Sequence, residues 1–137
     1  MFFYGLFMDE ELLKEQGLQP GPPEIACLDG FSLRIGERAT LVKTEDGQVW
    51  GTVMALQACE LEALYSDSSV SDYRPEAVVA TAHSGETLPC LVYNLPPNRL
   101  LGQNRDYLEK LIITSRKAGV PAFYTSELEA RYEAIAD

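Results

Sequence analysis

Apolar and polar residues alternate in the middle of the chain, a pattern that is typical of β-strands. Phe31, Leu33 and Ile35 share one face of such a strand, while Ser32 and Arg34 share the other. Further strands are predicted at about residues 39–44, 49–56, 75–83 and 88–93. The short apolar run at 2–5 predicts a buried first strand at the start of the sequence.

Glycine-containing turns predict how these strands pair. Asp46-Gly47 lies between 39–44 and 49–56, and Ser84-Gly85 lies between 75–83 and 88–93. Glycine accepts a positive φ, so each dipeptide predicts a β-hairpin.

Four segments have helical signals. Asp9 is a candidate N-cap, and Glu10 and Glu11 suit the first turn of the helix that follows. The other helices are predicted from Cys59 to Tyr65, from about Asn104 to Ala118, and from a capping-box pattern that begins at Ser126. Strands and helices are thus mixed along a chain of ordinary domain length. We expect one domain over residues 1–137, an α+β fold with a small mixed or antiparallel β-barrel and flanking helices.

The net charge argues against two classes of partner. It is -10, from 21 acidic and 11 basic side chains. A field of that sign repels nucleic-acid phosphates and anionic lipid. No apolar run approaches the roughly 18 residues that cross a bilayer, and the apolar start lacks the basic region of a signal peptide. We therefore expect a cytoplasmic protein that binds neither nucleic acid nor membranes.

Metal and nucleotide chemistry have little support in the sequence. His83 is the one histidine and lies beside a predicted turn, and the three cysteines form no CxxC pair. A catalytic triad would need His83 as its base, and no glycine-rich phosphate loop is present. We expect no cofactor and no metal, and a chemistry that uses carboxylates, hydroxyls and backbone donors.

The segment from Tyr4 to Met8 is the first candidate for such chemistry. A strand ends at Gly5 and a helix begins shortly afterwards. Backbone N–H groups at this kind of junction can hold an anion, with help from the helix dipole. An ordinary strand-to-helix turn would have the same pattern.

A series of short motifs gives the sequence a family resemblance. The opening Tyr4-Gly5-Leu6-Phe7 resembles the Tyr-Gly-Ser-Leu/Asn loop of gamma-glutamylcyclotransferases and their avirulence-induced-gene-like relatives. Six further segments resemble that family in the same order, namely 28–33, 49–53, 61–65, Tyr73-Arg74, 90–93 and 119–124. The resemblance covers nearly the whole chain and implies a gamma-glutamylcyclotransferase-like fold.

The resemblance also implies a reaction and a ligand. A gamma-glutamyl amine or peptide would fold back so that its α-amine attacks its own γ-carbonyl, which releases 5-oxoproline without a cofactor. In the family, a glutamate after the Leu-Asp helix relays the proton, and the Tyr-Gly loop donates N–H groups to the substrate. The implied partner is a small gamma-glutamyl ligand held by Tyr4, Gly5, Leu6 and Phe7. Tyr73 and Tyr124 are further candidates for the cleft from their residue type, although a tyrosine in the core is the more common outcome.

The family's catalytic position differs in this chain. Ser68 occupies the place of the glutamate, with Asp67 beside it, and Leu6 replaces the loop serine. A serine hydroxyl is a poor base without a partner. Asp67 is a substitute if the loop shifts by one residue, and Glu76 is another if its strand turns it inward. These departures leave open a non-catalytic binding or regulatory relative, an enzyme of altered specificity and a purely structural protein. The oligomeric state is also left open.

Overall fold

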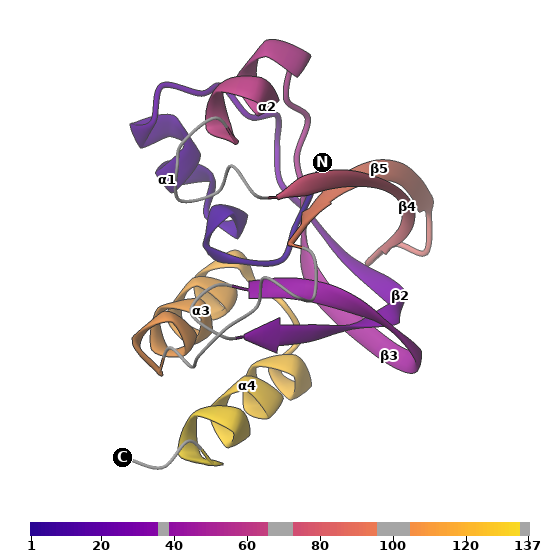
Figure 1. The fold of residues 1–137 in the computed structure, drawn as a ribbon, viewed down its shortest axis with the longest axis vertical. Helices are drawn as coiled ribbons and strands as arrows, with labels where there is room; N and C mark the ends of the chain where they lie inside the picture. The colour runs from indigo at the N-terminus through magenta and orange to yellow at the C-terminus, as the bar shows by residue number, and fades with distance from the viewer. Residues whose placement is uncertain (36–38, 66–72, 96–104, 135–137) are drawn as a thin grey trace.

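The strands form one antiparallel sheet. The computed structural model describes residues 1–35, 39–65, 73–95 and 105–134. Within these residues the sheet has five strands in the order β1-β3-β2-β4-β5 (Figure 1). They are β1 (Phe2–Phe3), β2 (Glu24–Ile35), β3 (Ala39–Val53), β4 (Arg74–Ala82) and β5 (Thr87–Asn94). The predicted α+β class with an antiparallel sheet is confirmed, but the sheet stays open because β1 and β5 are its two edges.

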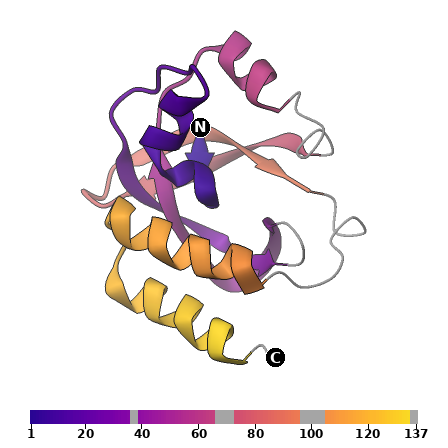
Figure 2. The same cartoon turned by 90° about the vertical axis from the view of Figure 1, so that its left-hand side faces the viewer.

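The helices form two groups at opposite ends of the molecule (Figure 1). α3 (Arg105–Ala118) and α4 (Ala122–Ala134) lie side by side (Figure 2). α1 (Glu10–Glu15) and α2 (Ala58–Leu64) lie at the other end, and η1 (Leu6–Met8) contacts both α1 and α3. Asp9 caps α1 as predicted, since its carboxylate accepts from the Glu11 N–H at 3.1 Å. No helix in the described ranges is long and apolar enough to cross a membrane.

The Asp46-Gly47 turn is a correction to the sequence prediction. These residues do not join two strands, because β3 runs unbroken from Ala39 to Val53 and pairs with β2 instead. The register shifts where residues 44–47 of β3 lie opposite Gly30 of β2. Gly30 has φ +84°, and a Cβ on Gly47 would lie 2.2 Å from the Phe31 carbonyl oxygen. Gly30 and Gly47 therefore allow an irregularity in the pairing of β2 with β3. A bulge and a turn have similar sequence signals.

The last helix also begins earlier than its capping-box pattern predicts. α4 starts at Ala122, four residues before Ser126. The Pro121 carbonyl accepts hydrogen bonds from the N–H groups of Tyr124 at 3.0 Å and Thr125 at 3.4 Å. Pro121 therefore caps the helix, and its missing N–H costs nothing at that position.

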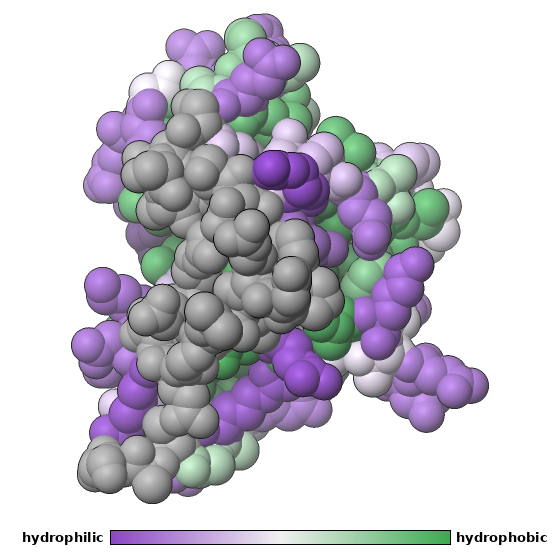
Figure 3. Space-filling view, viewed as in Figure 1, coloured by the Kyte–Doolittle hydropathy of each residue, from purple (hydrophilic) through white to green (hydrophobic). Residues whose placement is uncertain are grey.

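Within the described residues, the two long hairpins pair as strands over a short stretch. β2 and β4 pair at Ala26↔Ala82 and Cys27↔Thr81, whereas β4 and β5 pair over eight positions. At the far end of β5, the Thr40 hydroxyl hydrogen-bonds to the carbonyl and the N–H of Leu95. Between these two junctions the β2–β3 and β4–β5 hairpins diverge. In the space-filling view, hydrophobic surface lies recessed between hydrophilic side chains beside the grey atoms (Figure 3).

Candidate functional site

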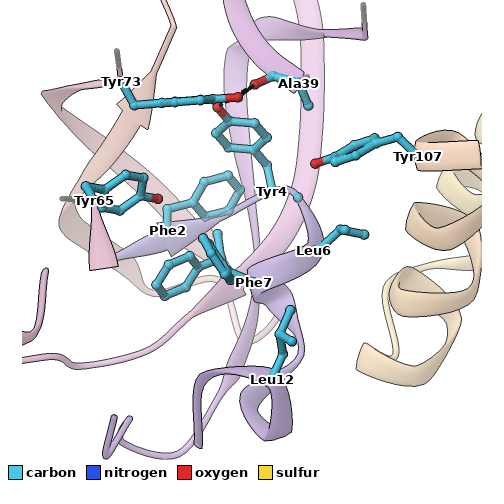
Figure 4. Close-up of a pocket in the computed structure, with 11 residues that line it drawn as sticks. Phe2, Tyr4, Leu6, Phe7, Leu12, Ala39, Tyr65, Tyr73 and Tyr107 are labelled. Atoms are coloured by element: carbon cyan, nitrogen blue, oxygen red, sulfur yellow. Dashed lines mark hydrogen bonds between the residues drawn. The ribbon is translucent and has the colours of Figure 1, made fainter. Parts of the chain in front are cut away.

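A cavity of about 260 Å³ lies where β1, η1, α1 and α3 approach one another. We call it the aromatic cavity, because most of its lining residues are aromatic (Figure 4). Its lining consists of Phe2, Phe3, Tyr4, Gly5, Leu6, Phe7, Leu12, Ala39, Tyr65, Tyr73 and Tyr107. Strand β1 places the first two in the core, and the chain then turns past the cavity before α1 begins.

Tyrosine hydroxyls gather at one end of the aromatic cavity. The Tyr4 hydroxyl donates to the Tyr93 carbonyl at 2.8 Å and lies 3.4 Å from the Ala39 carbonyl. The Tyr73 hydroxyl also donates to the Ala39 carbonyl (Figure 4). These bonds tie the end of β1 to β3 and β5 and fix the direction of two lining side chains.

Tyr107 of α3 closes this hydroxyl end against the start of η1. Its hydroxyl accepts a hydrogen bond from the Leu6 N–H. A Cβ added to Gly5 would lie 2.6 Å from the same hydroxyl oxygen. Gly5 has φ -108° and ψ -150°, an extended conformation that any residue adopts. Glycine is therefore needed here for the close approach of Tyr107 and not for its backbone angles.

The N–H groups of Gly5, Leu6 and Phe7 are the donors that the sequence singled out. No backbone carbonyl of the described residues accepts a hydrogen bond from any of them. The Leu6 N–H instead meets the Tyr107 hydroxyl, and all three residues line the cavity. A carboxylate of a ligand could accept from such donors.

The other end of the cavity is built mainly from aromatic and aliphatic side chains. Phe7 packs edge-to-face on Phe3, with ring centroids 6.2 Å apart, and on Tyr65 at 6.4 Å. Tyr65 in turn stacks on Tyr93 at 3.9 Å, with an angle of 5° between the ring planes. Figure 4 shows Phe7 and Leu12 on the side opposite the hydroxyls of Tyr4 and Tyr73. Such aromatic arrangements are favourable and hold the rings in place.

The described lining carries no formal charge. None of its side chains is Asp, Glu, Lys, Arg or His. Burial, with smaller contributions from neighbouring tyrosines, raises the pKa of Tyr4, Tyr65 and Tyr107, so these phenols stay neutral near pH 7. Among the residues that the structure describes, no group of three His, Cys, Asp or Glu side chains is placed to hold a metal ion.

The structure brings together five of the six residues expected to bind the ligand. Tyr4, Gly5, Leu6, Phe7 and Tyr73 all line the aromatic cavity. Tyr124 lies elsewhere, buried within α4, where burial raises its pKa to about 12. Asp67 and Ser68, which the sequence proposes for proton transfer, fall outside the described residues.

Glu76 lies in a different cavity. The burial pattern of β4 settles its orientation, because Glu76 shares the more buried side with Val78 and Ala80. That side faces a second cavity of about 360 Å³ where the two hairpins diverge. Its lining consists of Phe31, Leu41, Val42, Lys43, Arg74, Pro75, Glu76, Asn94 and Leu95. The structure therefore does not bring Glu76 into the lining shared by Tyr4 and Phe7.

Sequence reasoning did not single out Tyr65, Tyr107 or Leu12 as lining residues. Tyr107 follows the helical spacing of Leu108 and Leu111, and this spacing predicts only a core-facing side chain. Tyr65 is the C-terminal cap of α2, and Leu12 lies within α1. Their approach to the Tyr4–Phe7 segment depends on tertiary packing, and no local pattern encodes it.

Solved structures with the same fold extend over nearly the whole chain. One is a gamma-glutamyl cyclotransferase, 19% identical with a TM-score of 0.77, aligned over 94% of this chain and 85% of that protein. An uncharacterised protein from Homo sapiens is 21% identical with a TM-score of 0.76, over the same shares of the two chains. YkqA from Bacillus subtilis is 20% identical with a TM-score of 0.79. That alignment covers 99% of this chain but 54% of YkqA, so the chain spans about half of YkqA. Identities this low show the fold alone.

A family model matches the sequence directly. The model of the AIG2-like family covers residues 48–128, which is more than half of the chain and includes Tyr65, Tyr73 and Tyr107. No curated protein sequence is a significant match. The family match agrees with the fold and with the motif resemblance of the sequence. The chain therefore belongs to the AIG2-like family and has the gamma-glutamyl cyclotransferase-like fold.

Proposed function

We propose that this protein binds a small gamma-glutamyl or amino-acid-like ligand in the aromatic cavity. The observation that carries the proposal is the set of N–H groups on Gly5, Leu6 and Phe7, which have no carbonyl partner among the described residues and belong to the cavity lining. A ligand carboxylate would accept from these donors, and binding would replace the contact between Leu6 and Tyr107. The family and the fold support the choice of a gamma-glutamyl ligand.

The proposed reaction is ring closure within the bound ligand. The α-ammonium gives up a proton, and its nitrogen then attacks the γ-carbonyl carbon to form a five-membered ring. The bond from that carbon to the amine nitrogen breaks, and this nitrogen takes a proton as it leaves. The products are 5-oxoproline and a free amine. Any of the Gly5, Leu6 and Phe7 N–H groups that the carboxylate does not engage would stabilise the negative charge on the carbonyl oxygen in the transition state.

The proton relay is the open part of this proposal. We propose Asp67 or Ser68 for it. Glu76 lines the second cavity, so it would serve only a ligand that extends from the aromatic cavity into that one. The motif resemblance aligns Ser68 with the family's glutamate, and a hydroxyl cannot relay a proton unaided near neutral pH. This alignment favours a second candidate function, a non-catalytic ligand-binding or regulatory protein.

Ligand binding is tested first, because it is common to both candidates. Isothermal titration calorimetry with gamma-glutamylethylamine should give a measurable Kd for the unmodified protein. Leu12→Trp should abolish binding by filling the cavity, whereas Ile113→Trp, at a position on α3 that is 59% exposed, should leave it unchanged. Binding that survives Leu12→Trp would contradict the proposed location.

Turnover is then measured as 5-oxoproline release from ordinary gamma-glutamyl dipeptides. We expect little or no release, since general acid–base catalysis typically raises a reaction rate by about 100- to 10,000-fold and a serine at the relay position does not supply it unaided. Ser68→Glu should raise the rate if the cavity is otherwise competent. If Asp67 has taken over the relay, Asp67→Asn should abolish the activity and Ser68→Ala should not. Rapid release that persists in both Asp67→Asn and Glu76→Gln would refute this assignment.

A further inference from the structure

The second cavity is separate from the aromatic cavity. Its volume is about 360 Å³, and the described linings of the two cavities have no residue in common. One wall of the second cavity comes from β2 and β3, and the other comes from β4, β5 and the residue that follows β5. Sites for small molecules typically have volumes of about 300–1,000 Å³. A small molecule bound here would contact both hairpins at once.

The two walls carry side chains of opposite charge. Lys43 lies opposite Phe31 in the pairing of β3 with β2, so the two side chains share a face of that hairpin. Glu76 lines the same cavity from β4. Lys43 is exposed and Glu76 is half-buried, and no ion pair among the described residues includes either of them. The cavity thus presents a cation on one wall and an anion on the other.

Hydrogen bonds between the hairpins hold the base of the cavity in place. The Thr40 hydroxyl donates to the Leu95 carbonyl at 2.9 Å and accepts from the Leu95 N–H at 2.8 Å. The Asn94 side-chain oxygen accepts from the Leu41 N–H at 3.4 Å, so the NH2 group of Asn94 adds a donor to the lining. The apolar base of the cavity consists of Phe31, Leu41 and Leu95, and the last two are buried.

Arg74 is a second cation of the lining, on the same wall as Glu76. Its Nη1 donates to the Tyr73 carbonyl at 2.9 Å. It lies two residues before Glu76 in β4, so both side chains are on one face of that strand. With Lys43 on the opposite wall, the described lining has two positive charges and one negative charge. It should therefore attract a carboxylate more strongly than a lone ammonium group.

We infer that the second cavity binds a free α-amino acid with an apolar side chain. The ligand carboxylate would accept from Lys43 Nζ and from the Asn94 NH2 group, and the ligand ammonium would donate to the Glu76 carboxylate. Both contacts are charge-assisted, which makes them stronger than neutral hydrogen bonds. The ligand side chain would pack on the apolar base. The site is separate from the aromatic cavity, and the inference does not depend on the proposed function.

Three probes with the same side chain test the need for both charges. L-leucine is a zwitterion, L-leucinamide keeps only the ammonium, and N-acetyl-L-leucine keeps only the carboxylate. Their affinities are measured on the full chain by titration of a ¹⁵N-labelled sample, followed by nuclear magnetic resonance. A hydrogen bond to a charged group typically contributes about tenfold or more in affinity. We expect L-leucine to bind at least about tenfold more tightly than either derivative, with N-acetyl-L-leucine second. Glycine, which lacks the apolar side chain, should also bind at least about tenfold more weakly than L-leucine.

Variants assign each charge to its wall. Lys43→Gln should reduce the preference for L-leucine over L-leucinamide, and Glu76→Gln should reduce its preference over N-acetyl-L-leucine. Lys110→Gln and Glu109→Gln make the same changes of charge at exposed positions of α3 and should alter neither preference.

The location is tested in the same titrations. The resonance of the Asn94 side-chain amide should shift with L-leucine, and saturating gamma-glutamylethylamine should not displace L-leucine. Absence of L-leucine binding, or equal affinity for either derivative, would overturn the inference. Displacement by gamma-glutamylethylamine would place L-leucine in the aromatic cavity and would also overturn it. Failure of gamma-glutamylethylamine itself to bind would count against the proposed function alone.

Discussion

The contact between Gly5 and Tyr107 can be tested by one substitution on each side. Gly5→Ala places a methyl carbon 2.6 Å from the Tyr107 hydroxyl oxygen, where ordinary contacts begin at 3.4 Å. The hydroxyl must therefore move by about 0.8 Å, the difference between these two distances. Tyr107 is part of the packed start of α3, and overpacking of this kind costs about 1–3 kcal/mol.

The same geometry predicts that Tyr107→Phe rescues Gly5→Ala. With the hydroxyl removed, the nearest remaining atom of residue 107 is the ring carbon, 4.0 Å from the added methyl group. This is an ordinary contact. Alanine also restricts the unfolded chain more than glycine does, which favours folding by about 0.4–1 kcal/mol where the backbone angles allow it. In the Tyr107→Phe background, Gly5→Ala should therefore be neutral or slightly stabilising.

Urea denaturation of the four proteins, followed by the fluorescence of Trp50, measures this coupling. We expect an interaction energy of about 1–3 kcal/mol between the two sites, since residues in direct contact couple strongly. Gly5→Ala alone should lower the unfolding midpoint, and the double variant should regain most of the loss relative to Tyr107→Phe. If Gly5→Ala destabilises both backgrounds equally, the close approach of Tyr107 does not explain the glycine.

Three further predictions follow from the same part of the molecule. Gly51→Ala should lower the free energy of unfolding, measured by urea denaturation, by at least about 3 kcal/mol. The added carbon would lie 2.1 Å from the Phe3 carbonyl oxygen, and a backbone atom cannot move aside without disturbing β1. Unchanged stability would show that β1 shifts freely. Tyr4→Phe should cost about 1–3 kcal/mol, since the buried hydroxyl that donates to the Tyr93 carbonyl is lost; an unchanged midpoint would mean that water replaces it. The folded pKa of Tyr4 is well above its unfolded value of about 10, so the unfolded chain loses this proton first as the pH rises. The Tyr4 contribution to stability is thus complete below pH 10 and decreases above it by up to about 1.4 kcal/mol per pH unit. Tyr4→Phe should reduce that slope, and an equal slope in both proteins would argue against the raised pKa.

Local patterns were sufficient for most of the secondary structure. The β4–β5 hairpin, α2 and the cap of α1 lie where alternation, helical spacing and Asp9 predict them. The prediction of a hairpin turn at Asp46-Gly47 was wrong. The same sequence signal also fits an irregularity in the pairing of two longer strands, here β2 and β3. The partner of β3 is β2, and nothing within residues 39–56 identifies it.

The site was only partly predictable for a related reason. The Tyr4–Phe7 segment is contiguous, so its strand end and glycine are visible in the sequence. Tyr107 reaches the same cavity from a helix that begins about a hundred residues later, and its spacing matches that of a core residue. The sequence also left undecided which face of β4 carries the Glu76 side chain, since alanine and valine occur on both faces. In the structure Glu76 lies on the face that borders the second cavity.

The shortness of β1 has a consequence for how the aromatic cavity comes into being during folding. Both long hairpins join segments that are neighbours in the sequence, so each can form early from local contacts. β1 has only two residues, Phe2 and Phe3, and its partners Val53 and Thr52 are about fifty residues away. Closing so long a loop for so short a ladder is favourable only once β3 is in place. We therefore expect the first residues of the chain to dock late, so that the cavity wall that they supply is completed at the end of folding.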